Sequence, residues 1–120
     1  MKIAVTAEGS ASSANVDPRF GRARYFLVFD TETEKYEAHD NVQNVNAAQG
    51  AGIQAGQTVA RLGAQVVITG NMGPKAFDVL TQAGIKIFLI EGGTVEKAIA
   101  DWKNGALTEV GQPSKPGHWM

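Results

Sequence analysis

Short apolar runs and helically spaced apolar positions alternate along this chain, and their order predicts its secondary structure. Continuous apolar, β-branched or aromatic stretches predict four buried strands, at residues 3–7, 25–29, 64–69 and 85–90. After a polar turn at 31–34, residues 35–38 are expected to form a hairpin partner at the sheet edge. Apolar positions at helical spacing predict helices from about 47 to 62, from 74 to 83, and from 95 to a stop at Asn104-Gly105.

The resulting order, β-β-β-α-β-α-β-α, predicts an α/β protein with a five-stranded mixed sheet and helices on both faces. The first three strands are expected to pair antiparallel and the last two to be parallel, because crossover helices precede them. This order is shared with ribonuclease H-like folds. We expect one domain over residues 1–108 and a flexible tail over 109–120, where Pro113, Pro116 and Gly117 lie.

Composition narrows the classes of function. The 120 residues carry a net charge of −1, so no overall field favours nucleic acid or a membrane, and any anion site must be local. The chain has no cysteine, which excludes disulfides, thiolate nucleophiles and Cys-ligated clusters. The start lacks the apolar segment of a signal peptide, so a cytoplasmic location is expected.

Two short blocks carry the candidate chemistry, and both favour an anion. The first, between Asp17 and the strand at 25–29, holds three arginines, Arg19, Arg22 and Arg24. The second follows a strand and opens a helix, with Gly70, Asn71, Met72, Gly73, Pro74 and Lys75 in order. Arginines supply weakly hydrated planar donors, and a helix N-terminus supplies free N–H groups. We expect Phe20, Met72 and Ile53 to add an apolar wall.

Each candidate also has a purely structural interpretation. Arg19 and Arg22 could pair with Asp17 or Asp30 and fix the loop, Met72 could belong to the core, and Lys75 could be a solvated first-turn lysine. His39 is expected at the surface of the edge strand, and His118 in the tail. Either histidine is at most a weak metal ligand here.

Two enzymatic or nucleotide-binding interpretations fit the sequence poorly. A two-metal nuclease needs converging carboxylates, but neither the strand 3–7 nor the helix 47–62 contains an acid. The glycines at 50, 52 and 56 have the spacing G-x-G-x-x-x-G and follow an asparagine-rich segment, which departs from a dinucleotide fingerprint. We interpret these helix glycines as sites of close packing on the sheet.

The sequence Asp17-Pro18-Arg19-Phe20-Gly21-Arg22-Ala23 before a Tyr-Phe strand resembles the signature of the dinitrogenase iron–molybdenum cofactor biosynthesis family. The blocks at 50–53, 66–74, 83–87 and 93–98 continue the resemblance, which extends from residue 1 to about 108. It implies a ribonuclease H-like fold that binds, carries or stores a metal–sulfur cluster and catalyses no reaction. The family includes a subgroup, the orange proteins, that holds a molybdenum–copper sulfide cluster non-covalently.

The resemblance therefore implies a metal–sulfur cluster as ligand, of a Mo–Cu sulfide or iron–molybdenum type. Because such an inorganic anion needs no protein thiolate, the absence of cysteine suits this mode. A cluster-assembly ATPase or an acceptor protein is the expected partner. The competing class is a regulatory or scaffolding domain in which the arginine loop meets carboxylates of a protein partner and no metal is bound.

Overall fold

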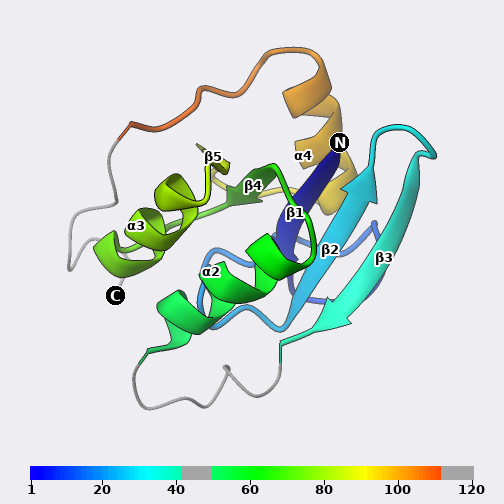
Figure 1. Ribbon diagram of the computed structural model, residues 1–120. Helices are drawn as coiled ribbons and strands as arrows, with labels where there is room; N and C mark the ends of the chain where they lie inside the picture. Colours follow the sequence, from blue (N-terminus) through cyan, green and yellow to red (C-terminus); the bar gives the residue numbers. More distant parts are fainter. Residues whose placement is uncertain (42–49, 112–120) are drawn as a thin grey trace.

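The computed structural model describes residues 1–41 and 50–111, which form one five-stranded sheet with three helices (Figure 1). The strand order across the sheet is β3-β2-β1-β4-β5. The elements, in chain order, are β1 (Lys2–Ala7), β2 (Tyr25–Asp30), β3 (Lys35–Asp40), α2 (Ala51–Arg61), β4 (Val66–Thr69), α3 (Pro74–Gln82), β5 (Lys86–Leu89) and α4 (Val95–Lys103).

The pairing within the sheet confirms the predicted mixture of strand directions. β1 pairs antiparallel with β2, and β2 pairs antiparallel with β3. On its other side β1 pairs parallel with β4, and β4 pairs parallel with β5. Because the carboxyl ends of β1 and β4 lie at the same edge of the sheet, the loops that follow these two strands meet there.

Helices cover both faces of the sheet and enclose two apolar cores (Figure 1). The helices α2 and α3 bury Val59, Phe77 and Leu80 against β1, β2, β4 and β5. On the opposite face α4 buries Val95, Ala98 and Ile99 against alternate residues of the same strands. β3 is largely exposed, as expected for an edge strand.

The glycines of α2 pack against a helix, so the expectation that they pack on the sheet is wrong. A Cβ at Gly52 would lie 3.3 Å from the Ala76 Cβ, and one at Gly56 would lie 2.9 Å from Val79 Cγ1. Both neighbours belong to α3. Small residues therefore bring α2 and α3 together. The predicted start of this helix, at 47–49, lies outside the described residues.

The end of α3 and the segment after α4 differ in detail from expectation. Ala83, the last residue of the predicted helix, is exposed and is the C-terminal cap of α3. Glu109 and Val110 belong to the predicted tail, but both contact β5. The Val110 N–H donates to the Ile87 carbonyl at 2.9 Å, and Glu109 forms an isolated antiparallel β-bridge with Phe88. His118 lies outside the described residues.

Within residues 1–41 and 50–111, no helix is long and apolar enough to cross a membrane.

A surface contact between the hairpin and α4 gives a prediction about pH. Lys103 Nζ lies 2.9 Å from Glu34 Oε1 and 4.8 Å from the centre of the Phe29 ring. The hydrogen bond from Lys103 and its positive charge lower the pKa of Glu34. A lowered carboxyl pKa means that the contact stabilises the fold above the ordinary pKa of Glu and is lost as the pH falls through the lowered value. In Lys103→Ala we expect the NMR titration midpoint of Glu34 to rise towards its ordinary value. An unchanged midpoint would contradict the contact.

Candidate functional site

The two blocks singled out in the sequence lie side by side at the carboxyl edge of the parallel strands. Arg19 and Asn71 form an isolated parallel β-bridge between the loop after β1 and the loop after β4. The approach is close, because a Cβ at Gly70 would lie 2.6 Å from Pro18 Cα. Only glycine permits this contact, so Gly70 shapes the junction of the two loops.

A third element, the first turn of α2, completes the site. Gly21 lies so close to α2 that a Cβ there would be 2.7 Å from the Gly52 backbone nitrogen. The helix begins after Gly50, whose φ of 79° is left-handed, and its first turn contains no acidic residue. The N–H groups of a first helical turn have no partner inside the helix. This end of α2 therefore favours negative charge.

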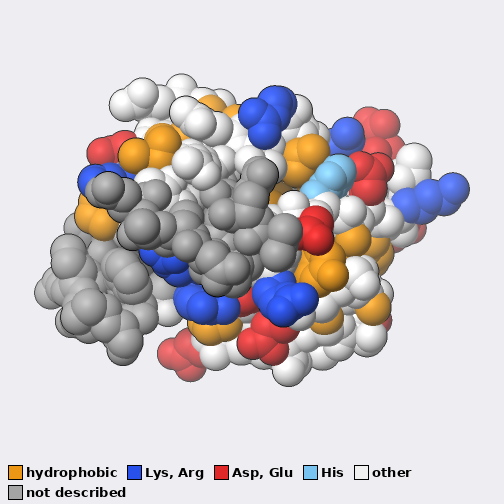
Figure 2. Space-filling model, turned by 90° about the horizontal axis from the view of Figure 1, so that it is seen from below, with side chains coloured by type: hydrophobic (Ala, Val, Ile, Leu, Met, Phe, Trp, Pro, Cys, Tyr) orange, Lys and Arg blue, Asp and Glu red, His pale blue; other side chains and the backbone are white. Residues whose placement is uncertain are grey.

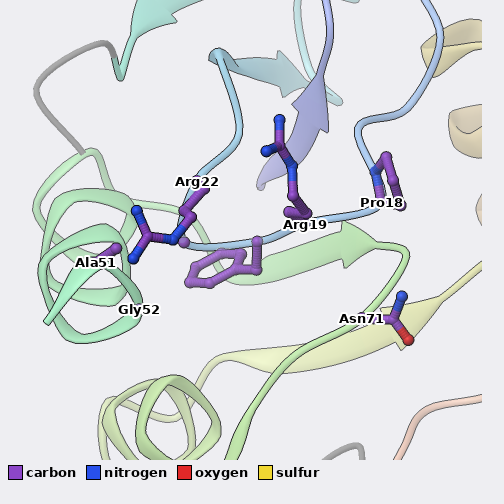
Figure 3. A pocket seen from close by; sticks show the side chains of 8 residues that line it. Pro18, Arg19, Arg22, Ala51, Gly52 and Asn71 are labelled. Carbon is purple, nitrogen blue, oxygen red and sulfur yellow. The ribbon is translucent and has the colours of Figure 1, made fainter. Parts of the chain in front are cut away.

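Together these three elements line a cavity of about 410 Å³ (Figure 3). Its lining residues are Pro18, Arg19, Phe20, Gly21, Arg22, Ala51, Gly52 and Asn71. In Figure 3 the side chain of Arg22 lies beside Ala51 and Gly52 at the start of α2, whereas that of Arg19 points away from Arg22 and Asn71 lies apart from both. On the face of the molecule seen from below, Lys and Arg side chains are interspersed with Asp and Glu side chains (Figure 2).

Arg19 combines the two roles considered for it from the sequence. Its side chain is 54% exposed, and its Nε lies 3.3 Å from Oδ1 of the buried Asp17. The alternative partner, Asp30, accepts instead a hydrogen bond of 2.8 Å from the backbone N–H of Glu32. Arg19 is thus anchored by Asp17 and still lines the cavity.

The apolar residues expected to form a wall are divided between the cavity and the core. Phe20 lines the cavity and is almost fully buried, with its ring centre 5.7 Å from that of Phe26. Met72 is 2% exposed and belongs to the core between α2, α3 and the sheet. Its position therefore fits the interpretation of Met72 as a core residue better than that of a wall of the ligand site. Ile53 is half-buried in the first turn of α2.

The other candidate residues lie outside the lining of the cavity. Arg24 and Lys75 are exposed, and Gly73 is the N-cap of α3. Gly70 acts through its contact with Pro18. His39 is on the edge strand, where its Nε2 lies 2.6 Å from Oε1 of Glu37. His118 is not among the described residues.

Asn41 is a site residue that sequence analysis missed. It is 2% exposed, and its Nδ2 donates to the carbonyl oxygens of Gly21 and Ala23, at 3.2 and 2.8 Å. It thereby holds the middle of the arginine loop against the end of β3. Ala51 and Gly52 were also missed as lining residues, although the run of glycines around them was a signal.

The groups that face this cavity are cations, N–H donors and apolar surface. In the described part of the chain, no three His, Asp or Glu side chains come close enough together to hold a metal ion. The arrangement suits a ligand that carries its own negative charge and is bound through its surface by cations and N–H donors, without direct metal ligation by the protein.

Fold and cavity together define a small α/β domain with an arginine-lined cavity at one edge of its sheet. Over residues 1–105 the chain matches the family described as "Dinitrogenase iron-molybdenum cofactor", and it belongs to that family.

Solved structures support this membership. The apo form of the orange protein from Desulfovibrio gigas is 45% identical, with a TM-score of 0.92, and the alignment covers 95% of this chain and 96% of that one. A provisionally named NifB protein from Thermotoga is 34% identical, with a TM-score of 0.85 and coverages of 97% and 98%. A relative found by sequence alone, an uncharacterized protein of Methanocaldococcus jannaschii, is 28% identical over 109 residues, 89% of each chain. The fold class expected from the sequence is thus confirmed.

Proposed function

We propose that this protein binds and carries a sulfide-rich metal cluster as non-covalent cargo, in the cytoplasm and without catalysing a reaction. The supporting observation is the cavity of about 410 Å³, in which Arg19 and Arg22 meet the first turn of α2. We further propose that the cargo contains molybdenum, as a Mo–Cu sulfide or an iron–molybdenum type of cluster. Residues 1–108 would form the carrier domain.

The physical argument rests on matching a large, soft anion to its surroundings. Sulfide at the surface of a cluster is a diffuse charge that accepts weak hydrogen bonds. Guanidinium groups are themselves weakly hydrated and delocalised, so they lose little by turning from water to such an anion. The apolar surface of Phe20 and Pro18 excludes water on one side, which strengthens the remaining electrostatic attraction.

A cluster-assembly ATPase or an acceptor protein is the expected partner of such a carrier. Arg24 and Lys75 are exposed and do not line the cavity. They are therefore better placed to meet a partner's carboxylates than to hold the cargo. The competing function, a scaffolding domain that binds only protein, would use the same cations with no metal.

The test is an absorption spectrum with metal analysis. Apo-protein is incubated with tetrathiomolybdate, with and without a copper salt, and then passed through a desalting column. We expect visible bands that elute with the protein, with molybdenum and sulfide in a fixed ratio. A colourless, metal-free product would reject the carrier and favour the protein-binding domain.

A further inference from the structure

Asp17 is a buried carboxylate that the carrier function does not itself require. It is 1% exposed, although ionised side chains are seldom buried without a partner. Its Oδ1 accepts the backbone N–H of Arg19 at 3.0 Å and the Arg19 Nε–H at 3.3 Å. One oxygen thus holds both the backbone and the side chain of the same arginine.

Asp17 contacts only the Nε side of the Arg19 guanidinium. Nε donates to Asp17, while the two terminal nitrogens of Arg19, which carry four N–H donors, have no hydrogen-bond partner among residues 1–41 and 50–111. Pro18, between the two residues, has a fixed φ and cannot donate a competing hydrogen bond. Asp17 and Pro18 therefore restrict the orientation of the Arg19 fork.

The main chain of Asp17 is anchored as well. Its N–H donates to the Thr6 carbonyl at 2.9 Å, and its carbonyl accepts from Thr6 Oγ1 at 2.7 Å. Thr6 Oγ1 also lies 2.8 Å from Thr69 Oγ1. A hydroxyl has one proton, and the Asp17 carbonyl can only accept, so the Thr69 hydroxyl must donate to Thr6.

This buried chain therefore runs from Thr69 to Thr6 to Asp17. Thr69 is followed directly by Gly70 and Asn71. The same three residues join the loop after β4 to the loop that carries Arg19.

From this geometry we propose that Asp17 is a positioning residue of the cavity, which orients Arg19 so that its terminal nitrogens meet the anionic cargo. The inference rests on the proposed carrier function. It assigns Asp17 a role through Arg19, with no contact to the cargo.

Asp17→Asn separates positioning from simple electrostatics, because the two predict opposite results. Removing a negative charge beside Arg19 should strengthen the binding of an anion if only net charge matters. Loss of positioning should weaken it. With tetrathiomolybdate and a copper salt as probe, we expect binding about tenfold weaker than in the wild type. The control Asp101→Asn removes a carboxylate from the exposed pair with Lys97 and should bind as the wild type.

A double-mutant cycle shows whether Asp17 acts through Arg19. In the Arg19→Ala background, Asp17→Asn should cause no further loss. An equal loss in both backgrounds would mean a merely structural role and would overturn the proposal, as would equal or tighter binding by Asp17→Asn alone.

Two further measurements keep the proposal testable if Asp17→Asn does not fold or if the wild type binds no cluster. In ¹H–¹⁵N spectra, the wild-type Arg19 Nε–H should exchange slowly with solvent and stand apart from the exposed arginines. If the Arg19 Nε–H exchanged as fast as those of the exposed arginines, the proposal would be overturned. If this N–H is protected but the wild type binds no tetrathiomolybdate, the carrier function is rejected, and with it the role towards the cargo, while the orientation of Arg19 by Asp17 stands. Arg19→Lys keeps the charge but removes the fork, so unchanged binding by this variant would also overturn the proposal.

Discussion

Replacing Arg19 and Arg22 together by alanine should weaken retention of the cluster about 100-fold while the fold remains intact. Both side chains line the cavity, and each is at least partly exposed. A hydrogen bond to a charged group contributes about 1.5–3 kcal/mol, so the loss of two such donors costs at least about 3 kcal/mol, which corresponds to about 100-fold or slightly more in affinity. The measurement is a titration of apo-protein with tetrathiomolybdate and a copper salt, followed by absorption and metal analysis.

The control for this variant must lose the same charge elsewhere. Lys35→Ala with Arg61→Ala also removes two positive charges, from β3 and from the last turn of α2, outside the lining of the cavity. We expect near-wild-type uptake by this control. Equal uptake by the Arg19/Arg22 variant and the wild type would show that the cluster binds elsewhere. If both double variants lost cluster uptake equally, net charge alone would account for the effect.

The order of the elements could be predicted because local patterns determined it. The run Tyr25–Phe29 is aromatic and β-branched, and Thr31–Glu34 is polar, so a strand and a turn were the only consistent interpretation. Strand directions followed from the length of the connections. The packing partner of the α2 glycines was not predictable, because a small residue in a helix indicates a close approach without saying to what.

For the site, the sequence predicted the two loops but not which helix N-terminus completes the cavity beside them. The arginine loop and the segment from Gly70 were expected to receive an anion, and they do lie together. The sequence pointed to the N-terminus of α3, however, whereas the cavity lies at that of α2. This difference arises from tertiary contacts, chiefly Gly21 against Gly52 and Asn41 against the loop carbonyls. Nothing local in the sequence pairs these residues.

Two glycines make this arrangement possible, and replacing either by alanine should disrupt it. A Cβ at Gly70 would lie 2.9 Å from the Pro18 carbonyl oxygen, and one at Gly21 would lie 2.9 Å from Gly52 Cα. These neighbours are backbone atoms, so relief requires that a loop or the start of α2 move. Overpacking of this kind typically costs about 1–3 kcal/mol. For Gly70→Ala and Gly21→Ala we expect a loss of that order in the free energy of unfolding, measured by urea denaturation.

Cluster binding should fall further than stability in these two variants, because the displaced loop carries Arg19 and Arg22 away from α2. Gly111→Ala is the matched control, since a Cβ there meets no atom within 4 Å. It should change neither the free energy of unfolding nor the uptake of tetrathiomolybdate. Wild-type stability and wild-type uptake in both Gly70→Ala and Gly21→Ala would contradict the close approach of the three elements. If these two variants were less stable but took up the cluster like the wild type, the cargo would bind somewhere other than this cavity, because binding would not depend on the geometry that the two glycines maintain.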